Sequence, residues 1–269
     1  MSKKTNILTM TYIGFLALIF LSSALGGILS AVVYFAAFVL PLAISLWFCK
    51  NEGREEKNYL TIDKASFKKT LPVIFPTVSL IIIVSVLTSV IIYVTTGRTN
   101  GVDVGNSFVP ALLRHALLPA ILEEALFRYL PLRLLAPHSR RGAVIISAFF
   151  FALVHHDLFS IPYAFIAGVV FMAVDLAVDS IIPSVIIHFI NNALSVGLLV
   201  FGDNPVFAPV IYIILAVLTI ISAIVIYRRR EVYRIMLSSA LDKGEGVKIT
   251  VEMILFAGLT LTVAVISLL

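Results

Sequence analysis

The sequence predicts an all-α protein, a polytopic transmembrane helical bundle with eight or nine spans, and three observations lead there. Of the 269 residues, 60% are hydrophobic and only 13% are charged, with a mean hydropathy of +1.07. Soluble domains carry roughly 25% charged residues. The apolar residues form runs of about 20, the length that a transmembrane helix needs. The charged residues gather between these runs, so the composition excludes a water-soluble enzyme.

The first apolar stretch runs from Asn6 to Phe48, twice the length of one span, and an interruption from Ser23 to Gly27 predicts a hairpin of two helices. Lys3 and Lys4 precede it as in a signal peptide, but its length predicts a retained span. The further candidate spans are Leu71–Thr95, Phe108–Leu135, Ala143–His155, Ile161–Val178, Ile181–Phe201, Phe207–Tyr227 and Thr250–Leu269. The last is the weakest candidate, because Glu252 lies at its start.

Short connections leave no room for a second, soluble domain, so residues 1–269 are expected to form a single integral membrane domain. Cytoplasmic loops of membrane proteins are rich in Lys and Arg. With the N-terminus in the cytoplasm, 17 of the 20 Lys and Arg residues fall in cytoplasmic segments, and only Arg98 falls in an outer loop. We therefore expect a multi-pass protein of the cell membrane with a cytoplasmic N-terminus. This topology explains the pI near 9.3 without a nucleic-acid partner.

Ionisable residues at membrane depth are costly and point to function. Three groups of polar residues follow one another along the chain on separate predicted spans. Glu123, Glu124 and Arg128 lie on the fourth span, Phe151 and His155 end the fifth, and His188 and Asn192 lie on the seventh. The core that carries them extends over about residues 108–201. The single Cys, Cys49, excludes a multi-cysteine metal centre.

Helix geometry suggests roles for these side chains, because residues four apart share a face. Glu124 precedes Arg128 by four residues, which is the favourable order for an ion pair. Glu123 points to a different side of the helix and does not share Arg128 as a partner. His188 and Asn192 also share a face and can both donate to an oxyanion. No Ser, Thr or Cys lies in a nucleophile motif, so water is the expected nucleophile, activated by Glu123 and His155. On ideal parallel helices Glu123 and His155 would differ by about 10 Å in depth. A tilt, a break at Pro119 or a cavity that shortens the fifth span would close this gap.

The Glu-Glu-x-x-x-Arg, Phe-x-x-x-His and His-x-x-x-Asn motifs, in this order, resemble those of the CPBP family of CAAX proteases and bacteriocin-processing enzymes. The resemblance covers about a third of the chain, and Gly168 and Pro183 are softer matches. It implies a glutamate-dependent intramembrane endopeptidase. The residues matching Glu123 and His155 would activate water, those matching His188 and Asn192 would form the oxyanion site, and Glu124 and Arg128 would support them.

The expected partners are membrane lipids and a peptide or protein substrate, with or without a lipid modification. CAAX-type processing of prenylated proteins and maturation of small peptides both fit the family. No cofactor is expected on this interpretation. One alternative is a metal-dependent membrane hydrolase with zinc held by Glu123, His155 and His188, although no His-Glu-x-x-His signature is present. Another is a non-catalytic membrane scaffold or immunity protein.

Overall fold

The computed structural model describes residues 2–49, 58–98, 104–105, 107–155, 157–240 and 250–266, and these contain helices and no strands. The first two helices form the predicted hairpin, α1 (Ser2–Ala24) and α2 (Gly27–Cys49). Gly27 begins α2 at a positive φ of 57°, a backbone conformation that glycine adopts without steric cost. The interruption seen in the sequence is therefore a tight turn between two apolar helices.

The third helix, α3 (Lys64–Thr96), begins seven residues before the predicted Leu71. Asp63 provides the reason, because its carboxylate accepts hydrogen bonds from the backbone N–H groups of Ala65 and Ser66 at 2.8 and 3.0 Å. These bonds cap the helix start. A hydrogen bond from the Ser66 side chain, together with the backbone bonds, holds the pKa of Asp63 below its ordinary value. Gly97 ends the helix in the left-handed conformation, with its N–H on the carbonyl of Tyr93.

The predicted fourth span is one helical rod of five segments that alternate between α and π geometry. They are α4 (Phe108–Leu112), η2 (Leu113–Leu117), α5 (Leu118–Glu124), η3 (Ala125–Tyr129) and α6 (Leu130–Leu134). Of the three alternatives that would bring Glu123 and His155 to one depth, the break at Pro119 does not occur. The rod continues through Pro119, and a π turn precedes it. Such π turns are frequent at functional sites.

The remaining helices are α7 (Arg140–Leu153), α8 (Ile161–Val178), α9 (Ile182–Val200), α10 (Phe207–Arg228), α11 (Arg230–Ala240) and α12 (Val251–Ile266). Helix α7 has 14 residues, begins three residues before the predicted Ala143 and ends two residues before His155, which lies in the turn that follows. Helix α11 lies within the connection 228–248, which the sequence indicated only as polar. It packs against α8.

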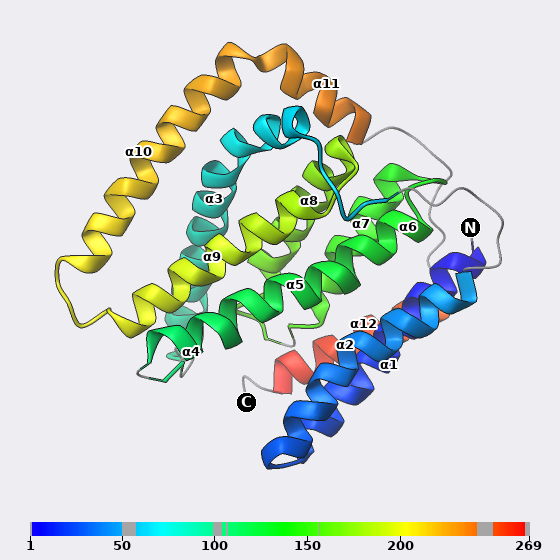
Figure 1. Cartoon of the computed structure of the whole chain (residues 1–269). Coiled ribbons are helices and arrows are strands. Elements are labelled where there is room, and N and C mark those ends of the chain that lie inside the picture. Colours follow the sequence, from blue (N-terminus) through cyan, green and yellow to red (C-terminus); the bar gives the residue numbers. More distant parts are fainter. Residues whose placement is uncertain are drawn as a thin grey trace.

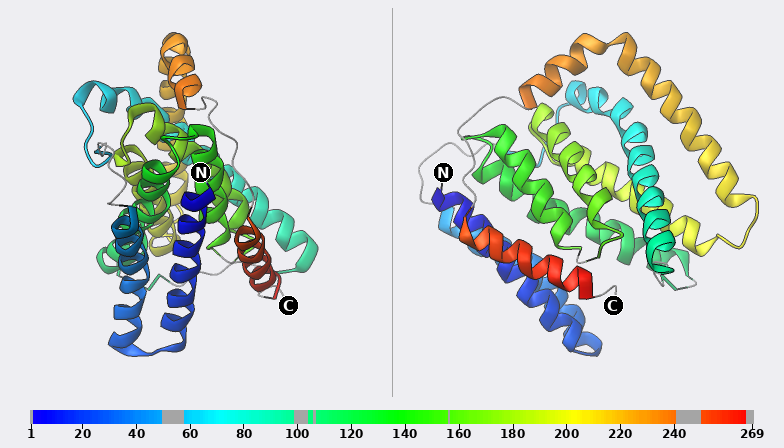
Figure 2. Two further views of the ribbon diagram at one scale, coloured as in Figure 1. Left: turned by 90° about the vertical axis from the view of Figure 1, so that its right-hand side faces the viewer. Right: turned by 180° about the vertical axis from the view of Figure 1, so that it is seen from behind.

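Figures 1 and 2 show how these helices are arranged. The α1–α2 hairpin and α12 lie on one side, the α4–α6 rod, α7, α8 and α9 form the centre with α3 beside them, and α10 and α11 form an outer arm. Tight packing of α7 on α8 depends on Gly168. A Cβ added there would lie 2.7 Å from the Cα of Ala148, closer than real Cβ contacts allow.

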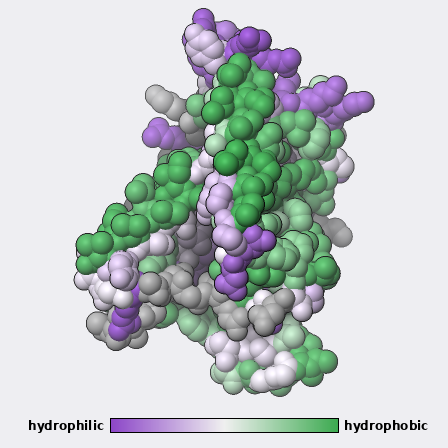
Figure 3. All heavy atoms as spheres, turned by 90° about the vertical axis from the view of Figure 1, so that its left-hand side faces the viewer, coloured by the Kyte–Doolittle hydropathy of each residue, from purple (hydrophilic) through white to green (hydrophobic). Residues whose placement is uncertain are grey.

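Six of the described helices, α1, α2, α3, α8, α9 and α10, are long and apolar enough to cross a membrane, and α12 is a shorter apolar helix. Large hydrophobic side chains such as Ile28, Trp47 and Val94 are exposed along them. A soluble monomer rarely exposes apolar surface this extensively. Figure 3 shows apolar side chains along much of one face, with hydrophilic side chains gathered at the end where α10 meets α11. The all-α transmembrane fold class is confirmed.

Candidate active site

The predicted ion pair between Glu124 and Arg128 is present and completely buried. The Nε of Arg128 lies 3.2 Å from Oε2 of Glu124, and both side chains have 0% exposure. The guanidinium carbon of Arg128 also lies 4.2 Å from the centre of the Phe151 ring and 5.4 Å from that of Phe171. A guanidinium over an aromatic face gains a cation–π attraction, which is largest where water is excluded. Arg128 thus joins the first motif to the second.

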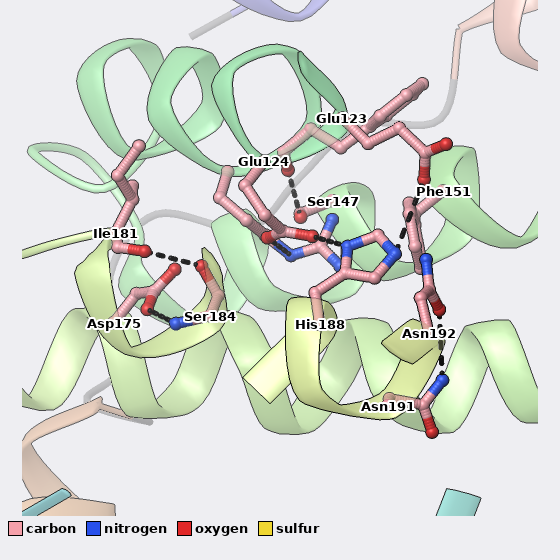
Figure 4. A network of polar contacts seen from close by, with 12 residues as sticks. Glu123, Glu124, Ser147, Phe151, Asp175, Ile181, Ser184, His188, Asn191 and Asn192 are labelled. Carbon is pink, nitrogen blue, oxygen red and sulfur yellow. Dashed lines mark hydrogen bonds and ion pairs between the residues drawn. The ribbon is translucent and has the colours of Figure 1, made fainter. Parts of the chain in front are cut away.

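His188 lies between the two adjacent glutamates (Figure 4). Its Nδ1 is 2.7 Å from Oε1 of Glu124, and its Nε2 is 3.8 Å from Oε2 of Glu123. An ionised carboxylate only accepts hydrogen bonds, so Nδ1 donates to Glu124 and the orientation of the ring follows. Helix periodicity indicated that Glu124 pairs with Arg128, but it gave no sign that Glu124 also holds His188, 64 residues further along the chain.

Phe151 and His155, four residues apart in the second motif, lie with the aromatic ring against the imidazole. The two ring centres are 4.9 Å apart, and His155 Nδ1 lies 2.7 Å from the backbone carbonyl oxygen of Phe151. A carbonyl oxygen only accepts, so Nδ1 carries the hydrogen and the Nε2 of a neutral ring keeps its lone pair. The turn after α7 therefore presents His155 with a basic nitrogen free for chemistry.

Asn192 is oriented by its neighbour. The side-chain amide of Asn191 donates to Oδ1 of Asn192 at 3.2 Å. This bond occupies the acceptor side of the Asn192 amide and leaves its NH₂ group able to donate. The sequence indicated Asn192 from its spacing to His188, but it did not indicate Asn191 as its partner.

These side chains meet at one cavity of about 1120 Å³. The predicted catalytic residues Glu123, His155, His188 and Asn192 all line it, while Glu124 and Arg128 lie behind them and are fully buried. The Glu123 side chain is 20% exposed, so it is the glutamate of the pair that faces the cavity. Arg114, His115, Tyr34 and Tyr163 also contribute to the lining.

Two buried residues behind the site, Asp175 and Ser147, lie outside the three sequence motifs. Asp175 on α8 is fully buried and accepts a hydrogen bond from the backbone N–H of Ser184 at 3.1 Å. It supports the start of α9, which carries His188. Ser147 donates to the carbonyl of Phe127 at 2.5 Å and is fully buried. Phe127 is free to accept because Pro131, four residues later, has no N–H.

Within the described ranges, no group of three or more His, Cys, Asp or Glu side chains is placed to hold a metal ion. His188 contacts both glutamates through its two different ring nitrogens, so one ion on Nε2 would leave Glu124 outside its coordination. His188 is thus hydrogen-bonded to Glu124 and lies within ion-pair distance of Glu123.

Comparison with known families gives one match. Residues 105–194 match the model of the family described as Type II CAAX prenyl endopeptidase Rce1-like. The matched range covers about a third of the chain. The match is consistent with the CPBP resemblance and holds all three motifs, from Glu123 to Asn192. The Rce1-like domain implies a protease. No curated protein and no solved structure matches the chain.

The Rce1-like domain corresponds to the central part of the fold, from the start of the α4–α6 rod to the second half of α9. The remaining helices, α1 to α3 and α10 to α12, lie outside the matched range. Some of them still contribute to the cavity, since Tyr34 of α2 and Ile81 of α3 line it.

Proposed function

We propose that this protein is a glutamate-dependent intramembrane endopeptidase that hydrolyses a peptide bond with an activated water molecule. The observation that carries the proposal is the position of His188, held by buried Glu124 on one nitrogen and facing Glu123 with the other, in a cavity shared with His155 and Asn192. This arrangement provides bases for water and donors for an oxyanion within one space.

In the first step Glu123 takes a proton from water, while His155 accepts a hydrogen bond from the same water through Nε2. The water oxygen forms a bond to the scissile carbonyl carbon, and the carbonyl π electrons move to its oxygen. The resulting oxyanion accepts hydrogen bonds from the Asn192 amide and from the Nε2–H of His188, whose ring carries a hydrogen on both nitrogens. Glu124 and Arg128 hold His188 in place and do not touch the reacting atoms.

In the second step the tetrahedral intermediate collapses and the C–N bond breaks. The leaving nitrogen takes the proton that Glu123 removed from water, which gives a carboxylic acid and an amine. The acid then passes its proton to the amine or to solvent and becomes a carboxylate. A donor pair fixed before the reaction stabilises the developing charge without reorganisation. The substrate is a peptide or protein segment, with or without a lipid, that enters the cavity.

The direct test compares the purified wild-type protein with Glu123→Gln and His155→Ala on a pool of quenched fluorescent peptides. General base catalysis contributes roughly 10²–10⁴-fold, so each variant should lose at least a hundredfold in rate while keeping its detergent-solubilised yield. Retention of more than about a tenth of the wild-type rate by either variant would refute its assigned role. Activity lost to a chelator and restored by zinc would instead support the metal hydrolase. No cleavage by the wild type of any peptide would favour the scaffold.

A further inference from the structure

The basic residues are concentrated at one end of the helical bundle. Successive helices alternate in direction, so the described residues at the N-terminus and in the α2–α3, α6–α7, α8–α9, α10–α11 and α11–α12 connections fall at one end, called here the basic face. Of the 15 described Lys and Arg residues, 12 lie at or beside these segments or in α11. The described residues of the connections at the opposite face, 25–26, 97–98, 104–105, 107, 154–155, 157–160 and 201–206, include Arg98 and no other Lys or Arg.

The cavity extends from the catalytic residues toward the opposite face. Its lining includes Ser22 and Gly27 at the α1–α2 turn, Val104 before α4 and Leu199 at the end of α9. All of these lie at or beside connections of the opposite face. Among the described residues that line the cavity, none belongs to a connection of the basic face.

The short helix α7 explains why space exists on this side. It begins at Arg140, at the basic face, and its 14 residues reach about 21 Å at 1.5 Å per residue. The hydrocarbon core of a bilayer is about 30 Å thick. Helix α7 therefore ends below the opposite surface, and His155 lies in the turn that follows it. The cavity lies beyond the end of α7, in space that a helix crossing the whole bilayer would fill.

We infer that the peptide substrate reaches the active site from the face opposite the basic loops, which is the non-cytoplasmic side of the membrane. The inference rests on the proposed function and adds to it the class of substrate. Positively charged loops stay in the cytoplasm. The substrate is then a segment on the outer side, such as the exported part of a membrane-anchored or secreted polypeptide, and not a chain end processed in the cytoplasm.

Cysteine labelling tests the direction in which the cavity opens. In a Cys49→Ala background, which has no other cysteine, three single variants are compared. Ser195→Cys lies in the cavity lining, Ser23→Cys is exposed beside the α1–α2 turn, and Lys68→Cys is exposed at the basic face. Intact cells are treated with a bulky maleimide that cannot cross membranes, and a second sample is treated after the membranes are broken.

Ser195→Cys and Ser23→Cys should be labelled in intact cells, and Lys68→Cys only after the membranes are broken. Labelling of Ser195→Cys only in broken membranes, or labelling of Lys68→Cys in intact cells, would overturn the inference. These outcomes do not depend on catalysis, so they remain informative if the proposed function fails.

A cleavage assay then tests from which side of the membrane the substrate reaches the active site. A pool of quenched peptides with charged ends, unable to cross the bilayer, is added to right-side-out vesicles and to inverted vesicles. Cleavage at least tenfold faster in the right-side-out vesicles, and abolished by Glu123→Gln, is expected. Faster cleavage in the inverted vesicles would overturn the inference and leave the protease assignment in place. A rate that Glu123→Gln does not lower would refute the proposed mechanism, and the labelling result would still decide the direction of opening.

Discussion

Arg128 provides the sharpest test of how the site is held together. Its side chain has 0% exposure, is the largest fully buried one in the described chain, and forms an ion pair with Glu124 at 3.2 Å. Arg128→Ala removes the guanidinium and leaves the Glu124 carboxylate buried with His188 as its remaining partner. Breaking a buried pair by deleting one partner costs about 3–5 kcal/mol, because the remaining charge is uncompensated.

The loss of packing adds to this cost, since the guanidinium lies 4.2 Å from the centre of the Phe151 ring and no described side chain would take its place. In a protein of this size each kcal/mol lowers the melting temperature by roughly 2–4 °C, so Arg128→Ala should melt roughly 6–20 °C below the wild type. Thermal unfolding in detergent, followed by tryptophan fluorescence or by aggregation, measures the shift.

The matched control is Arg133→Ala, on the same helical rod. Arg133 is only partly buried and donates to the hydroxyl of Tyr129 at 3.1 Å. Its removal should lower the melting temperature by no more than a few degrees. The reasoning about Arg128 fails if Arg128→Ala melts within about 2 °C of the wild type. An Arg128→Ala protein that is stable yet inactive would place the guanidinium in the chemistry itself.

Three further predictions follow from the geometry. Asn192→Ala should lower the rate of the chemical step by roughly 10²–10³-fold with little change in KM, as expected for one lost oxyanion donor; an unchanged kcat would contradict its role. Gly168→Ala should destabilise the packing of α7 on α8 and lower the melting temperature, whereas Gly197→Ala, where the nearest atom to a Cβ is a Phe207 ring carbon at 3.5 Å, should be tolerated. Similar melting temperatures for the two glycine variants would show that α7 and α8 can move apart to accommodate a Cβ at little cost in stability. After exhaustive chelation, the protein should keep cleaving its peptide with metal below stoichiometry, and a rate that requires added zinc would refute metal-free catalysis.

The sequence by itself predicted the fold class and indicated Glu123, His155, His188 and Asn192, which line one cavity. The thickness of the bilayer fixes the length of a transmembrane helix at about 20 apolar residues, so such helices can be predicted from apolar runs in the sequence alone. Helix period placed Glu124 with Arg128 and Phe151 with His155, because residues four apart in a helix are neighbours whatever surrounds them. The three motifs in order also indicated the family that the match over residues 105–194 supports.

Only the tertiary structure decided how the motifs meet. The contact of His188 with Glu124 spans 64 residues, and no local period relates the two. The position of Arg128 over Phe151 and the support of α9 by Asp175 also depend on how α7, α8 and α9 pack around the rod. The continuous rod through Pro119 required π turns, whose formation depends on neighbouring helices that satisfy the freed backbone groups. Local propensity determines each helix, and packing between helices determines which side chains share the cavity.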